Sequence, residues 1–188
     1  MARNAEQTRQ RLLTAASEEF AALGIAGARV DRIAVAADCN KAMIYTHFGS
    51  KDQLFEAVFT AEVTDRIGQV TFDPTELPDY AGRLFDCFDA RPDTLRLYIW
   101  YNLERPGGPS LLAIGQANET KLALLEQAQA DGLVSDHYAA VELLTLIRSI
   151  ASAWALLSHS SLGPTATATR ARCRHTVVDA VRRLIRPD

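Results

Sequence analysis

Chemically useful side chains gather on one side of a short segment near the amino end of the chain. In Lys41–Phe48, the residues Ile44, Tyr45 and Phe48 repeat at helical spacing and share one face. The other side carries small or polar groups: Lys41, Ala42, Met43, Thr46 and His47. Hydrogen-bond donors and methyl groups on a short, firmly held helix suit the major groove of DNA, where base edges present acceptors and the thymine methyl.

A second short helix and a tight turn must position this segment. Ile33, Ala34 and Ala37 share one helical face, and the three residues that follow interrupt the pattern. Asn40 is a good N-cap, because its side-chain oxygen can accept from an unpaired amide at the start of the next helix. A helix this short is not stable alone in water, so its neighbours must hold it. The stretch Val30–Lys51 therefore reads as two short helices joined by a tight turn.

The segment A-V-A-A-D-C-N-K-A-M-I-Y-T-H-F-G-S-K-D-Q-L-F resembles the helix-turn-helix signature of TetR-type transcriptional regulators. The positions that fit are Ile33, Ala34, Ala37, Lys41, Ile44, Tyr45, Phe48, Ser50, Lys51, Leu54 and Phe55. Positions on or beside the reading face depart from the family pattern: Asp38, Cys39, Asn40 and Ala42. Asp and Asn tolerate the turn backbone, and Asn caps as well as Ser, so these departures affect base specificity rather than the fold.

The resemblance implies DNA contacts for a set of residues in and around this motif. The implied set is Arg29, Asn40, Lys41, Ala42, Met43, Tyr45, Thr46, His47 and Lys51. Tyr45 and Lys51 match the family's phosphate-contacting positions. Lys41 can donate to guanine acceptors, and the methyl groups of Met43 and Thr46 can meet a thymine methyl. The alternative, with Tyr45 in the core and the others as solvated helix residues, stays open at this point.

Composition places the chain among globular proteins of a reducing compartment. Of its 188 residues, 48% are hydrophobic, and the three cysteines are widely separated. The cysteines and the scattered histidines form neither a disulfide framework nor a metal-ligand spacing, so we expect no metal and no cofactor. No stretch has the character of a signal peptide or the length of a membrane span. We therefore expect a cytoplasmic protein without a membrane partner.

Cys39 lies just before the amino terminus of the second short helix, where a thiolate would be stabilised. This position permits a redox-sensor interpretation. We favour the interpretation that Cys39 is a small apolar turn residue standing where the family prefers Val.

Charge is distributed unevenly along the chain. The net charge of −3 argues by itself against nonspecific nucleic-acid binding, but residues 1–51 carry a small positive excess. A denser cationic group lies near the carboxyl end: Arg170, Arg172, Arg174, Arg182, Arg183 and Arg186. This group is either a DNA-binding tail or a solvated, salt-bridged helix face. We favour the helix face, because no groove-reading pattern accompanies the arginines.

Helical periodicity accounts for the whole chain and no β pattern appears, so we predict an all-α fold. Residues 1–51 are expected to form a three-helix helix-turn-helix DNA-binding domain, with a connecting helix to about residue 70. Residues 71–188 are expected to form a helical effector-binding and dimerisation domain. The expected helices are Glu6–Leu23, the two of the helix-turn-helix, Lys51–Arg66, Tyr80–Phe88, Leu95–Leu103, Ser110–Ala130, Asp136–His159 and Ala168–Ile185.

Two features of the carboxyl-terminal domain suggest how it assembles. Leu95–Leu103 is apolar around most of its circumference, so we expect a central, buried helix. A seam of three- and four-residue steps suits helix-on-helix packing: Ala140, Leu143, Ile147, Ile150, Trp154 and Leu157. One short recognition helix reads too few bases for useful specificity, so we expect a homodimer on a two-fold site. This seam and the stripe Val177, Val181 and Leu184 are expected to pack against their symmetry mates.

Aromatic residues gather in the last two-thirds of the chain: Phe85, Phe88, Tyr98, Trp100, Tyr101 and Trp154. Core packing explains most of them. In TetR-type regulators this region encloses a small-molecule pocket, and Tyr and Trp offer both apolar area and a polar tip. The resemblance therefore makes these six the candidate ligand-binding residues.

The sequence as a whole predicts a dimeric, ligand-responsive transcriptional regulator. We expect a repressor that a small apolar or aromatic effector releases from double-stranded operator DNA. The alternative is an all-helical enzyme or carrier with an incidental helix-turn-helix. Catalysis would require a nucleophile–base pair or a metal set, whereas carboxylates such as Glu104, Glu119 and Glu142 are isolated in the sequence.

Overall fold

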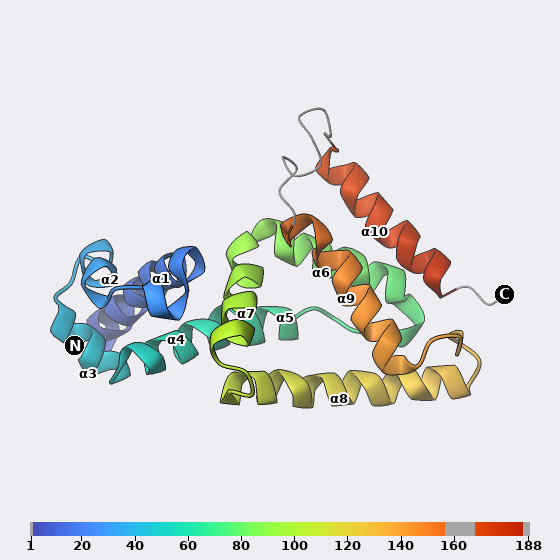
Figure 1. Ribbon diagram of the computed structural model, residues 1–188, viewed down its shortest axis with the longest axis horizontal. Coiled ribbons are helices and arrows are strands. Elements are labelled where there is room, and N and C mark those ends of the chain that lie inside the picture. Colours follow the sequence, from blue (N-terminus) through green and yellow to red (C-terminus); the bar gives the residue numbers. More distant parts are fainter. Residues whose placement is uncertain (1, 157–167, 186–188) are drawn as a thin grey trace. The chain divides into compact units, whose positions relative to one another are not determined.

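The computed structural model describes residues 2–156 and 168–185, and the regular structure in these ranges is entirely helical (Figure 1). The expected all-α fold is confirmed. The chain forms two compact units, here called the first unit (Met1–Arg66 and Asp93–Ala113) and the second unit (Ile67–Pro92 and Ile114–Asp188). Within the described ranges, no helix combines the length and the apolar character needed to cross a membrane.

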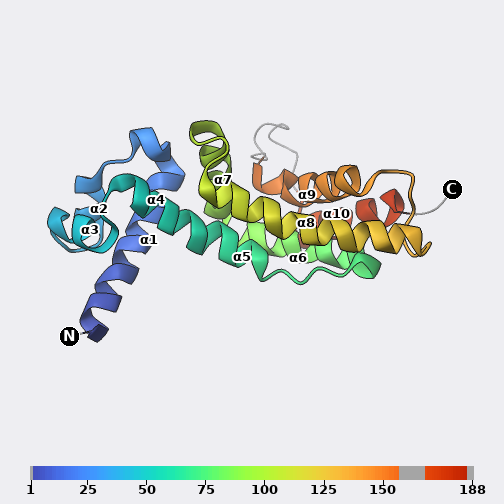
Figure 2. The ribbon, with the colours of Figure 1, turned by 90° about the horizontal axis from the view of Figure 1, so that it is seen from below.

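The first unit is built from the amino-terminal helices and one helix from the middle of the chain. In order these are α1 (Ala2–Gly27), α2 (Val30–Ala36), α3 (Lys41–Phe48), α4 (Lys51–Phe59) with a π-helical turn (Thr60–Thr64), and α7 (Pro92–Glu104). The helix α5 (Asp65–Gly68) follows the π-helical turn, and α8 (Pro109–Ala130) begins in this unit. α4 crosses and packs against α1, as Figure 2 shows.

Aromatic side chains fill the centre of the first unit. Phe20 of α1 meets Phe55 of α4 edge to face at 5.0 Å between ring centroids. The ring of Tyr101, from α7, lies 4.2 Å from Phe59 and 5.6 Å from Phe55. All four rings are fully buried, and each buried ring of this size contributes about 1.5–3 kcal/mol to folding. A helix distant in sequence thus completes the core of the amino-terminal helices.

α7 differs from its prediction in two ways. Its buried residues are Thr94, Leu95, Leu97 and Tyr101, while Leu103 is 69% exposed. The expected central helix is therefore wrong for Leu103, because the side of α7 that carries this residue stays exposed. Residues 93–113 also group with the first unit, whereas a single domain was expected for 71–188.

The second unit contains α6 (Leu77–Ala90), the rest of α8, α9 (Ala140–Leu156) and α10 (Arg170–Leu184), preceded by a 3₁₀ turn (Pro74–Glu76). α6 packs against both α9 and α10. Leu143 and Ile147 of α9 are 1% and 0% exposed, and Val177 and Val181 of α10 are fully buried, within this single chain.

The predicted dimer seam therefore needs correction. These side chains, which were expected to pack against symmetry mates, already lie in the core of their own second unit. A periodic stripe shows that a helix has a buried face, but it does not identify the neighbour that buries it. Leu157, the last residue of the seam, lies outside the described residues.

The arginines near the carboxyl end form ion pairs on helix surfaces. Arg170 pairs with Asp86 and Asp89, Arg174 with Asp86, and Arg182 and Arg183 with Asp179. The interpretation as a salt-bridged face is confirmed for these four arginines, whereas Arg186 lies outside the described residues. Such exposed pairs add little stability, but they neutralise the positive charge that a DNA-binding tail would require.

Candidate nucleic-acid interface and effector cavity

Local capping sets the ends of α3, the predicted recognition helix. Asn40 accepts a hydrogen bond from the amide of Met43 at 3.0 Å, as predicted for an N-cap. Asp38 adopts a left-handed conformation in the preceding turn (φ 50°), which a short polar side chain tolerates. Gly49 (φ 79°) ends the helix, and Ser50 caps α4 by accepting from the amide of Gln53. The predicted bounds of α3, Lys41–Phe48, are therefore confirmed.

α3 divides cleanly into a buried and an exposed side. Ile44 and Phe48 are buried, while Lys41, Ala42 and Thr46 are exposed and Met43 and His47 are half-buried. Tyr45 is 47% exposed, so the interpretation that placed it in the core is wrong. Lys41, Ala42 and Thr46 thus lie on the exposed side of one short helix, whereas Met43 is partly covered.

Several predicted DNA-contacting groups already have protein partners. The Lys41 ammonium lies 3.0 Å from a carboxylate oxygen of Asp31 on α2, and this hydrogen bond raises the pKa of Lys41. The Thr46 hydroxyl donates to the Ala42 carbonyl. Lys51 donates to the carbonyls of Ile25 and Ala28 at 2.6 and 3.1 Å. One of its three N–H donors remains for a phosphate.

The remaining members of the set lie at the edges of the motif. The amide of Arg29, at the N-cap position of α2, donates to Glu19 at 2.9 Å, and the Arg29 side chain is exposed. His47 has a buried Nε2 with no hydrogen-bond partner among the described residues. Burial raises the pKa of the Cys39 thiol, which opposes the thiolate that a redox sensor requires.

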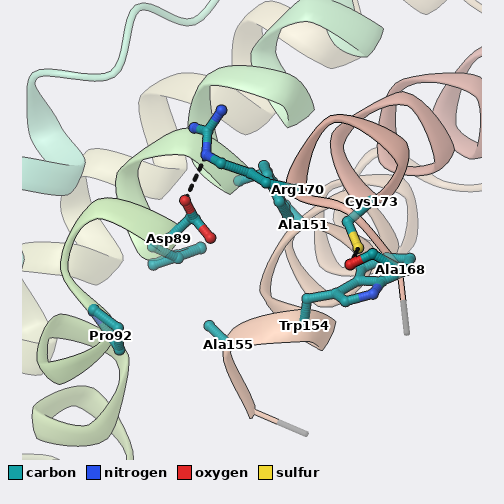
Figure 3. Close-up of a pocket in the computed structure, with 10 residues that line it drawn as sticks. Asp89, Pro92, Ala151, Trp154, Ala155, Ala168, Arg170 and Cys173 are labelled. Atoms are coloured by element: carbon teal, nitrogen blue, oxygen red, sulfur yellow. Dashed lines mark hydrogen bonds and ion pairs between the residues drawn. The ribbon is translucent and has the colours of Figure 1, made fainter. Parts of the chain in front are cut away.

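A cavity of about 260 Å³ opens in the second unit, between the carboxyl end of α6 and helices α9 and α10 (Figure 3). Its lining is mainly apolar, with one ion pair: Phe85, Phe88, Asp89, Pro92, Ala151, Trp154, Ala155, Ala168, Arg170 and Cys173. Phe85 and Trp154 meet edge to face at 6.5 Å. The volume lies just below the range of typical ligand pockets.

The charged groups at this cavity neutralise each other. Figure 3 shows Arg170 directed at Asp89, and its Nε donates to that carboxylate at 2.6 Å. A terminal nitrogen of Arg170 donates to Asp86 at 2.6 Å, and the guanidinium lies 5.8 Å from the centre of the Phe85 ring. A guanidinium held by two carboxylates offers little net attraction to an anion, so the cavity suits a neutral molecule.

The structure divides the six predicted ligand-binding residues between the two units. Phe85, Phe88 and Trp154 line the cavity. Tyr98, Trp100 and Tyr101 lie on α7 in the first unit. The indole of Trp100 donates to the carbonyl of Ala21 at 3.2 Å, and the Tyr101 hydroxyl donates to Glu56 at 2.8 Å. Tyr98 is half-buried, and its carbonyl accepts from the Asn102 side chain.

The pairing of polar groups in both units was not predicted from the sequence. Arg170 and Asp89 at the cavity are 81 residues apart, and Glu56 and Tyr101 are 45 apart. No local pattern links such positions, because each pair joins two helices that are distant in the sequence. Only Cys173 carried a weak signal, as a small apolar-type residue on the inner stripe of the last helix.

Two family profiles match this chain. Residues 12–58 match the profile described as bacterial regulatory proteins, tetR family. Residues 76–183 match the profile described as tetracyclin repressor-like, C-terminal domain. The first match spans the helix-turn-helix, and the second spans most of α6–α10.

Individual relatives agree with these profiles. The HTH-type transcriptional repressor SCO4008 of Streptomyces coelicolor is 37% identical over 159 residues, which are 83% of this chain and 82% of that protein. The HTH-type transcriptional repressor NicS of Pseudomonas putida is 28% identical over 163 residues, 79% of this chain and 76% of NicS.

Solved structures extend the likeness to three dimensions. The crystal structure of SCO4942 from Streptomyces coelicolor, described as a transcriptional regulator, superposes with a TM-score of 0.81 at 40% identity, covering 96% of this chain and 99% of that one. The hemolysin II transcriptional regulator HlyIIR shares the fold, with a TM-score of 0.66 at 20% identity over 98% of this chain and 99% of its own.

Proposed function

Since this chain belongs to the TetR family of transcriptional regulators, we propose that it is a dimeric repressor that a small, largely apolar or aromatic effector releases from its operator. The observation that carries this proposal is α3, a capped helix whose outer side presents Lys41, Ala42, Tyr45 and Thr46. The named relatives are transcriptional regulators, which favours regulation over catalysis or transport. Its place of action is the cytoplasm, where the operator is accessible.

The DNA contacts fall into two groups. Arg29, Tyr45 and Lys51 anchor phosphates and fix the register of the protein, while α3 reads bases. The Asn40 side-chain oxygen is engaged in the cap, so its amide group is the part that can donate to DNA. Lys41 reaches guanine acceptors, the methyl groups of Met43 and Thr46 meet thymine, and the small Ala42 permits close approach. His47 supplies a further contact at the carboxyl end of α3.

The cavity of the second unit receives the effector. Its volume of about 260 Å³ and its neutralised ion pair favour a small, uncharged molecule. Phe85, Phe88 and Trp154 would bury an aromatic or aliphatic group. Pro92, the first residue of α7, also lines the cavity, so a bound molecule would touch the start of a helix whose remaining residues belong to the first unit.

The outer face of α9 provides the dimer contact in place of the buried seam. Val141, Thr145 and Ser149 are exposed at one-turn spacing, and Val141 is 57% exposed. These side chains are uncharged and short, so a second α9 can approach closely and bury them. The exposed side of α10 is rich in arginine instead, and we assign it to the rim of the contact.

A selection experiment tests this function. Native protein is used to enrich binding sequences from a pool of random DNA duplexes, and the product is called the enriched duplex below. We expect a two-fold symmetric consensus, bound with a salt dependence that reflects several phosphate contacts. A thermal-shift screen with small neutral aromatic compounds then identifies effectors, which should weaken binding to the enriched duplex. Failure to enrich any sequence would overturn the proposal.

A further inference from the structure

The connection between α1 and α2 is a single turn with its own polar groups to satisfy. α1 is broken at Gly24, where the backbone leaves the helical region (φ 69°, ψ −178°). The chain then makes one turn, closed by a hydrogen bond from the Ala28 amide to the Gly24 carbonyl at 3.2 Å. This turn, Ile25–Ala28, leads directly into the helix-turn-helix. Its first amides lack partners within the turn.

α7 supplies these partners from one of its faces. Glu104 accepts from the amides of Ile25 and Ala26 at 3.0 and 2.9 Å, using both carboxylate oxygens. Arg96 and Trp100 both donate to the carbonyl of Ala21, at 3.0 and 3.2 Å. The three α7 residues are spaced four apart, so they form one stripe along the helix. Each member of the stripe engages the end of α1 or the turn after it.

Two further observations show how tightly this junction is built. A Cβ at Gly24 would collide with the Glu104 carboxylate and the Trp100 ring, and its positive φ also favours glycine. On the other side of the turn, Lys51 of α4 donates to the carbonyls of Ile25 and Ala28. A side chain from α7 therefore binds the amides of this turn, and a side chain from α4 binds its carbonyls.

From this geometry we infer that Glu104, supported by Arg96 and Trp100, positions the helix-turn-helix for base reading. The inference rests on the proposed function. These residues do not need to touch DNA, because they act by fixing the turn from which α2 and α3 continue. A carboxylate that accepts two backbone amides forms charge-assisted hydrogen bonds, which are stronger than neutral ones. Base reading depends on the placement of α3, whereas nonspecific binding depends on phosphate contacts alone.

The test compares specific with nonspecific binding. In Glu104→Gln the side-chain amide can accept only one of the two hydrogen bonds. We expect affinity for the enriched duplex to fall about tenfold, while affinity for a random duplex at low salt changes less than about twofold. Trp100→Phe keeps the ring and loses only the N–H donor, so a loss of about threefold is expected. Hydrogen exchange at the Ile25 and Ala26 amides should become faster in Glu104→Gln.

Glu126→Gln is the matched control, because Glu126 is exposed on α8 in the second unit and the change in net charge is the same. Thermal unfolding checks that each variant folds. If Glu104→Gln does not fold, Trp100→Phe still tests the inference. If native protein enriches a duplex but Glu104→Gln and Trp100→Phe retain the specific-to-nonspecific ratio of Glu126→Gln, the inference is overturned. If native protein enriches nothing, the proposed function fails instead.

Discussion

The ion pair between Asp31 and Lys41 lies on the side of the first unit where α3 is proposed to meet DNA. Both side chains are largely exposed, and their atoms are 3.0 Å apart. Asp31 holds the ammonium group in one place, and in the proposed complex it would also bring negative charge toward the phosphates. The ion pair should therefore improve discrimination between bases at the expense of overall affinity for DNA.

Asp31→Asn should tighten binding to every duplex at low salt by about threefold, because one repulsive charge is removed. The preference for the base opposite Lys41 should decrease, since the ammonium group is no longer held. Anisotropy titrations on the enriched duplex and on single-base variants measure both effects. Asp136→Asn, an exposed change in the second unit, is the control. Equal tightening in both variants would remove Asp31 from the reading surface.

Lys51 is proposed to contact a phosphate, and it also donates hydrogen bonds to two backbone carbonyls. Two measurements on one variant distinguish these roles. Lys51→Ala should flatten the salt dependence of binding by about one phosphate contact. It should also lower the melting temperature, because the carbonyls of Ile25 and Ala28 lose their donor. Salt titrations and thermal unfolding report the two roles independently. A lower melting temperature with an unchanged salt slope would make Lys51 purely structural.

Lys121 is a cation in a partly buried site near Tyr80, with its ammonium 3.4 Å from the Tyr80 hydroxyl. Burial, with a smaller effect from Arg148, lowers the pKa of Lys121 below its usual 10.5. The folded state therefore binds this proton less tightly than the unfolded state. The resulting penalty is fully present below the folded pKa, and it disappears as the pH rises toward 10.5.

Lys121→Met should accordingly raise the melting temperature near pH 7, by about 2 °C. The advantage over native protein should shrink as the pH rises toward 10.5, the usual pKa of lysine. Thermal unfolding across this range measures the difference. Arg172→Met, which removes an exposed charge from α10, should give no such pH-dependent gain. A gain that stays constant with pH would contradict the assigned cause.

At the scale of helices, the features set by local residues could be predicted from the sequence. Asn40, Gly49 and Ser50 carry the start and stop signals of α3 and the start of α4, and all three act as expected. The bounds of α6, α7 and α8 agree to within a few residues for the same reason. The π-helical turn Thr60–Thr64 was not foreseen, because no residue there differs from an ordinary helix interior.

The neighbour of each buried helix face was harder to predict than the face itself. Leu143 and Ile147 were recognised as a buried stripe, but they are buried within their own chain, where α9 packs against α6 and α10. The contacts of Glu104 with Ile25 and Ala26 join residues almost 80 positions apart. Such pairings depend on how complete helices pack, and a single sequence records only the periodicity of each helix.

The proposed dimer contact is tested by a charge on the outer face of α9. Thr145→Glu should produce monomers, because two copies would bring like charges together in a closely packed interface. Operator affinity should fall more than about tenfold, since a monomer reads half of a two-fold site. Sedimentation measures the assembly, and Thr120→Glu, on the exposed side of α8, is the control. A Thr145→Glu dimer would place the interface elsewhere.

The whole molecule is organised as two units through which the chain passes more than once. It crosses between them at Arg66–Ile67, at Pro92–Asp93 and at Ala113–Ile114. One of these crossings, at Pro92, lines the cavity. An effector bound there, as proposed, would touch the first residue of α7, and it would act only if it bound one conformation better than the other.

Because Trp100 lies in the first unit and Trp154 in the second, we expect one to affect DNA binding and the other to affect effector binding. Trp154→Ala should weaken binding of a screened effector about tenfold and leave binding to the enriched duplex nearly unchanged. Trp100→Ala should leave effector affinity nearly unchanged and weaken the enriched duplex instead. Calorimetric titration and anisotropy measure the two affinities. Loss of effector affinity in Trp100→Ala would return this residue to the ligand-binding set.

The contribution of α7 to the first unit matters for recombination between relatives. A chimera cut after the connecting helix, near residue 70, would combine one protein's Gly24 junction with another protein's residues at positions 96, 100 and 104. The foreign helix would have to reproduce an acceptor for Ile25 and Ala26 and donors for Ala21. Exchange of DNA specificity should therefore succeed when residues 93–113 are taken from the same protein as the amino-terminal helices. By this inference, the residues that set DNA reading are encoded in two separate stretches of the gene, because the first unit is formed by residues 1–66 and 93–113.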